Sequence, residues 1–128
     1  MKLDYRKTML DEAGVLALLE LPRVGPKTIM RLVEAGASVH DLASFTSCVT
    51  KDLPSIIKFS PPSQPELENY WNIAIETVSK AEANGVLCLS ICNPLYPTRL
   101  RNIPDPDPIL FLMGNWESLN APCVAVIG

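Results

Sequence analysis

The sequence has 128 residues, of which 48% are hydrophobic and 20% are charged, a balance that is typical of a folded globular protein and excludes a disordered chain. Its formal net charge of −3 argues against a strongly basic protein that binds nucleic acid through charge alone. No apolar run approaches the roughly 18 to 20 residues of a membrane span, and the N-terminus lacks a secretory signal, so we expect a cytoplasmic protein without membrane contact.

The first predicted element is a helix over residues 8–20. Thr8 and Asp11 have the spacing of a capping box, and apolar residues follow at helical intervals. Pro26 suits the first turn of a second helix, which Gly36 ends. The two short helices, joined by the segment LPRVG, are therefore expected to form a hairpin.

Two further short helices are predicted before the longest one. Ser38 and Asp41 repeat the capping-box spacing, which predicts a helix over residues 38–45. Another is expected within residues 46–59, although β-branched residues and Pro54 interrupt the helical pattern there. This part of the chain is therefore expected to be helical.

The clearest helical pattern starts at Ser63. Ser63 and Glu66 have the spacing of a capping box, and Pro65 suits the first turn. Asn84 and Gly85 close a helix of about five turns. The apolar residues of one helical face are Leu67, Tyr70 or Trp71, Ala74, Val78 and Ala81.

Three short apolar runs follow, over residues 86–91, 108–114 and 122–128. Each is bounded by turn-forming residues, as buried strands are. The change of pattern predicts a helical domain over residues 1–84 and a β-containing unit over residues 85–128. The expected fold class is therefore α+β or α/β.

The cysteines and the single histidine do not form a metal-site pattern. The cysteines contain no CxxC pair, and His40 has no partner at the spacing of zinc ligands. We expect buried reduced thiols, a surface histidine, and neither a metal nor a cofactor. The four cysteines are Cys48, Cys88, Cys92 and Cys123.

Residues 21–32 suit an anion. Backbone N–H groups at a tight glycine-containing turn before a helix form a positive, concave site. The segment resembles the helix-hairpin-helix family, whose connection reads L-P-G-[IV]-G-[PK]-[KR]-[TS]. The matching residues are Leu21, Pro22, Val24, Gly25, Pro26, Lys27 and Thr28. Arg23 stands where the family has its first glycine, and a positive φ would strain it there.

The helix-hairpin-helix resemblance implies contact with DNA backbone phosphates without sequence preference. The candidate contact residues are Arg23, Val24, Gly25, Lys27 and Arg31. The alternative is that the hairpin only packs two helices at an angle.

Residues 96–115 resemble a longer and more specific signature. The pattern Y-P-x-x-L-[RK]-x-[IL]-x-[DN]-P-P-x-x-L-[FY]-x-x-G-[ND] belongs to the DNA-processing protein A family, also called DprA or Smf. The matching residues are Tyr96, Pro97, Leu100, Arg101, Ile103, Asp105, Pro106, Pro108, Leu110, Phe111, Gly114 and Asn115. Asp107 replaces the usual second proline. The order of the expected elements extends the resemblance over essentially the whole chain.

The DprA resemblance implies both a fold and a role. The fold would be an N-terminal helical domain resembling a sterile alpha motif, followed by the first strands of a Rossmann-like domain. Members of the family are bacterial cytoplasmic proteins that bind and protect single-stranded DNA and help to load the RecA recombinase during natural transformation. They have no established catalytic reaction. We therefore expect a role in DNA processing and recombination, with single-stranded DNA and RecA as partners.

We interpret the signature as scaffold rather than as a site. Tyr96 and Pro97 would start a turn, and Leu100 and Ile103 would anchor it to the sheet. Its two arginines, Arg99 and Arg101, are expected on a solvated face, with contact to an acidic partner as the alternative.

The last residues carry a further candidate contact. In the DprA family the segment VAVIG precedes a glycine- and Ser/Thr-rich loop that holds DNA phosphate. Gly128 is therefore a candidate contact residue, and the main phosphate loop is expected beyond this sequence. Strands without their covering helices would expose apolar edges, which predicts self-association.

A different class of function remains open for this chain. Acidic residues outnumber basic ones over residues 36–85, which favours a protein-protein interaction or regulatory module without DNA binding. An enzyme is not expected, because no nucleophile–base pair, paired-carboxylate motif or GxGxxG is present.

Overall fold

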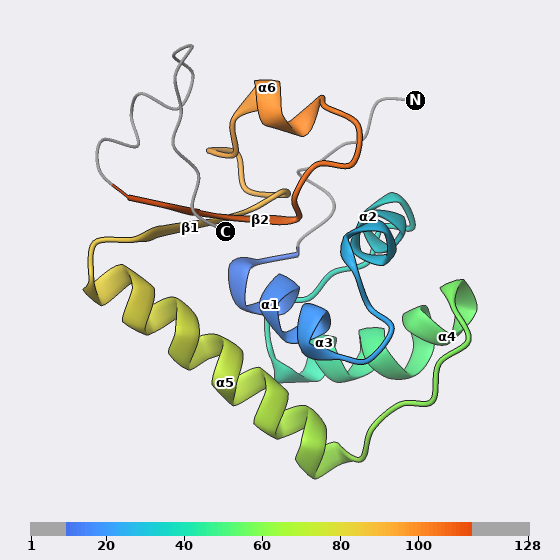
Figure 1. Cartoon of the computed structure of the whole chain (residues 1–128). Helices are drawn as coiled ribbons and strands as arrows, with labels where there is room; N and C mark the ends of the chain where they lie inside the picture. Colours follow the sequence, from blue (N-terminus) through green and yellow to red (C-terminus); the bar gives the residue numbers. More distant parts are fainter. Residues whose placement is uncertain (1–9, 114–128) are drawn as a thin grey trace.

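The computed structural model describes residues 10–113, and its fold class is α+β, as expected (Figure 1). The helices α1 to α5 precede a two-stranded sheet whose connection contains the short helix α6. In chain order the elements are α1 (Glu12–Glu20), α2 (Pro26–Glu34), α3 (Leu42–Ser47), a π-helical turn η1 (Cys48–Asp52), α4 (Leu53–Ile56), α5 (Gln64–Ala83), β1 (Leu87–Ser90), α6 (Thr98–Arg101) and β2 (Ile109–Leu112).

Helix α1 begins later than predicted, and Asp11 rather than Thr8 caps it. The Asp11 carboxylate accepts the Gly14 N–H at 2.6 Å. Leu10 is extended in a parallel bridge with Val39, and the Asp11 N–H donates to the Val39 carbonyl at 3.1 Å. This pairing takes the backbone groups that a helix from residue 8 would need. Burial raises the pKa of Asp11, although the Gly14 N–H works against that shift.

The same bridge delays α3. The prediction that this helix starts with a capping box between Ser38 and Asp41 is wrong, because Val39 is held in the bridge. Asp41 is the N-cap, and its side chain and that of Ser44 form a reciprocal capping box. Hydrogen bonding by the Ser44 backbone N–H, and then by its side chain, lowers the pKa of Asp41.

The predicted helical content of residues 46–59 is present as two short pieces, η1 and α4. The Leu53 N–H reaches back to the Cys48 carbonyl, a five-residue step that widens the helix. Pro54 follows in the first turn of α4, where its missing N–H is tolerated.

Helix α5 agrees closely with its prediction. It begins after Ser63, and Gly85, with φ +75°, turns the chain toward β1. The predicted capping box is not formed, because the Ser63 hydroxyl donates to the Glu66 carboxylate at 3.2 Å and no side chain caps the helix. Trp71 on its buried face meets Phe45 of α3, with ring centroids 5.7 Å apart.

The two strands pair antiparallel, with Leu87 opposite Leu112 and Leu89 opposite Leu110. A parallel Rossmann-like pairing is therefore absent between these two strands. In Figure 1 they lie between α1 and α6. The third predicted strand, over residues 122–128, lies outside the described residues.

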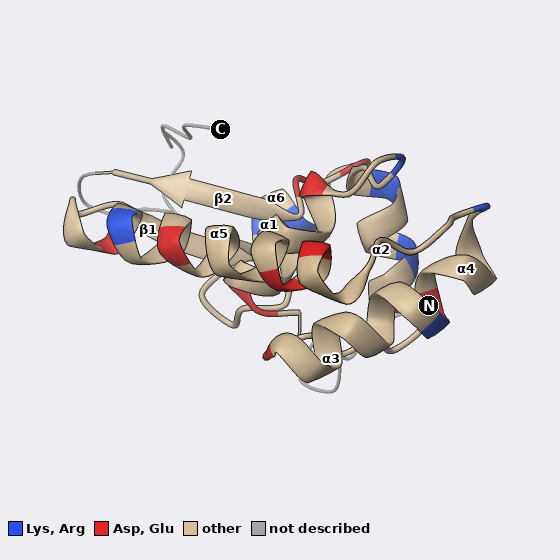
Figure 2. Ribbon diagram, turned by 90° about the horizontal axis from the view of Figure 1, so that it is seen from below, with Lys and Arg blue, Asp and Glu red and all other residues tan. Residues whose placement is uncertain are grey.

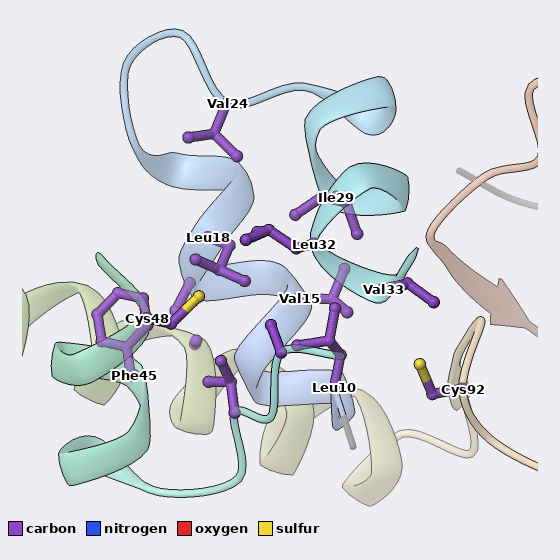
Figure 3. Close-up of a cluster of buried hydrophobic side chains, with 14 of the residues drawn as sticks. Leu10, Val15, Leu18, Val24, Ile29, Leu32, Val33, Phe45, Cys48 and Cys92 are labelled. Carbon is purple, nitrogen blue, oxygen red and sulfur yellow. The ribbon is translucent and has the colours of Figure 1, made fainter. Parts of the chain in front are cut away.

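The buried core runs through helices and strands without interruption. Val15 and Leu18 of α1 are fully buried at its centre, and α1 packs against α2, α5 and both strands (Figure 3). Leu89 and Leu110 of the sheet belong to the same cluster. The division at residues 84 and 85 stays a prediction, and the two parts share one core.

The cysteines of the described residues, Cys48, Cys88 and Cys92, are all buried. Burial raises the pKa of Cys48 to about 12 and also raises that of Cys88, so both thiols stay protonated at neutral pH. Cys123 lies outside the described residues. Within residues 10–113, no helix has both the length and the apolar character that a membrane crossing requires.

Candidate nucleic-acid interface

The loop between α1 and α2 turns at Arg23. Its backbone has φ +71°, the left-handed conformation, at the position where the helix-hairpin-helix pattern has glycine. The Val24 N–H donates to the Leu21 carbonyl at 3.3 Å and closes the turn. Arg23 therefore keeps the turn that glycine would make, at a cost of roughly 1 to 2 kcal/mol.

The loop is anchored by its apolar residues. Leu21 and Val24 are 2% and 7% exposed, and the side chain of Val24 points from the loop toward α1 and α2 (Figure 3). Val24, one of the predicted contact residues, thus offers only its backbone to a ligand.

The N-terminus of α2 lacks a side-chain cap. Gly25 is the N-cap, and Pro26, which has no N–H, occupies the first helical position. The first N–H group that donates within the helix is that of Ile29, which reaches the Gly25 carbonyl at 3.1 Å. The N–H groups of Lys27 and Thr28 come before it and have no acceptor within the helix. A Cβ on Gly25 would meet no atom within 4 Å, so the space beside it is open. Two backbone donors and the positive end of the helix dipole therefore lie at this helix start.

Exposed cations surround this helix start. Arg23, Lys27 and Arg31 are all exposed. In Figure 2 blue positions lie on α2 and the loops near it, while α5 carries several red ones. The predicted basic residues are thus brought together at one end of the molecule.

Lys58 also lies in this basic region, although no local sequence pattern indicates it. The Arg23 guanidinium Nη1 donates to the Lys58 carbonyl at 3.4 Å. These two residues line a pocket together with Pro22, Phe59 and Ser60. Only the fold, which returns the segment after α4 to the hairpin, places Lys58 there.

A groove of about 280 Å³ lies on the other side of α2. The groove lies between α2 and Asp105 and Pro106, two residues of the signature. Its lining is Pro26, Lys27, Met30, Arg31, Glu34, Asp105 and Pro106. The hairpin and the signature, far apart in sequence, are therefore adjacent in the fold.

The signature holds the connection between β1 and β2, as the scaffold interpretation expects. Tyr96 is 2% exposed, and its hydroxyl donates to the Asp107 carbonyl at 2.7 Å. Pro97 is the N-cap of α6, and Leu100 packs against the core. Asp105 has φ +51°, which turns the chain before β2.

Two details of that interpretation are wrong. Arg101 does not lie on a solvated face, because its guanidinium carbon lies 5.3 Å from the centre of the Tyr96 ring and its Nη2 donates to the Asn93 carbonyl at 2.8 Å. Ile103 is 48% exposed and so does not anchor the turn to the sheet. Gly114 and Gly128 lie outside the described residues.

A hydrogen-bonded link joins α1 to the end of β1. The Glu12 carboxylate accepts the Ser90 N–H at 2.8 Å and the Asn93 side-chain N–H at 3.4 Å. The Ser90 hydroxyl donates to the Leu10 carbonyl at 2.6 Å. Glu12 thus holds the end of β1 against α1, a role that local sequence patterns do not indicate.

The comparison with known families agrees with the signature. Residues 87–128 match the family model of DNA recombination-mediator protein A. The resemblance to DprA is thus confirmed over a segment that begins at β1. No curated protein and no solved structure gives a significant match. The DprA match indicates a role in DNA processing or recombination, and the helical hairpin lies outside the matched residues.

Proposed function

We propose that this chain acts in DNA processing or recombination by holding single-stranded DNA, with the hairpin between α1 and α2 contacting backbone phosphates. The uncapped start of α2 carries the proposal, because its free N–H groups, its dipole and the exposed Lys27 favour an anion in the same place. The family match of residues 87–128 supports DNA as the source of that anion.

The contact between the hairpin and the phosphates is electrostatic and does not itself distinguish one base from another. Arg23, Lys27 and Arg31 supply the positive charge, and the net charge of −3 keeps the affinity low. Binding of this kind weakens steeply as salt rises, because each neutralised phosphate releases its counterions.

The resemblance to DprA supports a more specific role for this chain. The chain would protect single-stranded DNA in the cytoplasm and assist the loading of RecA in natural transformation, with no chemical step of its own. The principal phosphate loop of such proteins follows the segment that ends at Gly128, so the hairpin would be an auxiliary contact.

A protein-protein interaction module is the second candidate. Ile73 and Ile75 of α5 are 47% and 43% exposed, although isoleucine is usually buried. Acidic residues interspersed along this helix would keep DNA away and favour a protein partner.

Fluorescence anisotropy with labelled single-stranded DNA tests the proposal. We expect Lys27→Ala to lower the affinity and to reduce the slope of log affinity against log salt by about 1. Lys80→Ala is the matched control, because Lys80 lies near the C-terminal end of α5, away from α2, and pairs with Glu76. Affinity that falls equally in both variants, or no binding at low salt, would contradict a phosphate site at the hairpin.

A further inference from the structure

The groove between α2 and residues 105–106 combines three kinds of chemistry. Lys27 and Arg31, one helical turn apart, supply positive charge along one side. Met30 and Pro106 contribute apolar surface. Glu34 and Asp105 add two carboxylates. A groove with apolar walls and a few convergent polar groups is the usual form of a small-molecule site.

The cations of the groove are available to a ligand. Within residues 10–113, neither Lys27 nor Arg31 forms an ion pair with Glu34, Asp105 or any other described acid. The charges therefore share the groove without neutralising each other in direct contact.

A nucleotide satisfies all three features together. Its phosphate suits the α2 start and Lys27, and its base has an apolar face that can lie against Met30 and Pro106. The two carboxylates, which accept hydrogen bonds, suit a base with an exocyclic amino group. An acidic peptide would instead meet repulsion from Glu34 and Asp105.

We propose that this groove is a base-binding subsite, which receives one unstacked nucleotide of a single strand and prefers bases that carry an amino group. The inference rests on the proposed function, since the phosphate at the hairpin places the base beside the groove. A duplex is excluded from the subsite, because its bases are stacked and their amino groups are paired.

The experiment compares labelled oligo-dC and oligo-dT of equal length, at neutral pH and low salt, on the whole chain. Both are pyrimidine strands, and of the two bases only cytosine has an exocyclic amino group. We expect oligo-dC to bind about tenfold or more tightly, the effect of one added hydrogen bond to a charged group.

The double variant Glu34→Gln, Asp105→Asn removes both charges with little change in shape. Asparagine tolerates the left-handed backbone of Asp105, which has φ +51°, so the loop is expected to keep its form. We expect both strands to bind more tightly because repulsion is lost, and the preference for oligo-dC to shrink. An unchanged circular dichroism spectrum and unfolding midpoint verify that the variant is folded.

The outcomes separate this inference from the proposed function. Equal affinity of oligo-dC and oligo-dT, or a preference that the double variant retains, overturns the subsite, while sensitivity to Lys27→Ala keeps the phosphate site. Binding of neither strand overturns both. Displacement of oligo-dC by poly-glutamate as effectively as by unlabelled oligo-dC would identify the groove as a peptide site and overturn the subsite.

Discussion

At the residue scale, Arg23 carries the least favourable backbone of the candidate interface. Its φ of +71° suits glycine, so Arg23→Gly is expected to raise the free energy of unfolding by about 0.5 to 1 kcal/mol. Arg23→Ala removes the same guanidinium but keeps the strain, and it is expected to be about 1 kcal/mol less stable than the glycine variant. Urea unfolding measures the difference between the two variants. If the glycine variant were no more stable than the alanine variant, the positive φ at residue 23 would not be a source of strain.

At the element scale, the start of α2 has no side-chain cap, which lowers helix stability and leaves N–H groups for the proposed phosphate contact. Gly25→Asp would cap the free N–H groups, and we expect about 0.5 kcal/mol more stability in thermal unfolding together with weaker DNA binding. Gly25→Asn caps the same groups without a negative charge and is expected to weaken binding less. The open space beside Gly25 accommodates both side chains. DNA binding that Gly25→Asp leaves unchanged would show that phosphate does not reach these N–H groups.

At the scale of the whole molecule, Glu12 joins α1 to the end of β1. Glu12→Ala leaves the Ser90 N–H without its acceptor, so the free energy of unfolding should fall by about 1 to 3 kcal/mol. Glu12→Gln should lose less, because its carbonyl oxygen can still accept that N–H. Glu20→Ala, at the exposed end of α1, is the control and should stay within about 0.5 kcal/mol of the parent in denaturant unfolding. If Glu12→Ala and Glu20→Ala lowered the free energy of unfolding equally, the hydrogen bond from Ser90 to Glu12 would not be a specific source of stability.

Local patterns in the sequence predict the elements whose ends are fixed by local chemistry. Pro26 at the first position of α2 and Gly85 beyond α5 mark helix ends that need no tertiary contact. The starts of α1 and α3 are mispredicted because Leu10 and Val39 pair across the chain, and a bridge between distant residues leaves no local pattern.

The candidate site also has parts that local sequence predicts and parts that only the folded chain brings together. The hairpin motif predicts the turn at Arg23 and the position of Lys27, since both depend on consecutive residues. Lys58 and Asp105 come to α2 only through the folded chain, and each follows the hairpin by a long stretch of sequence. Arg101 is mispredicted as solvated because its contact with Tyr96 requires the turn that the signature forms.

The most direct test of the phosphate site is an NMR titration of the isotope-labelled chain with short single-stranded DNA. We expect the largest amide shift changes at Gly25, Lys27 and Thr28, and we expect added salt to reverse them. Changes confined to α5 or to the strands, with the α2 amides unmoved, would contradict the claim that the hairpin holds the DNA backbone.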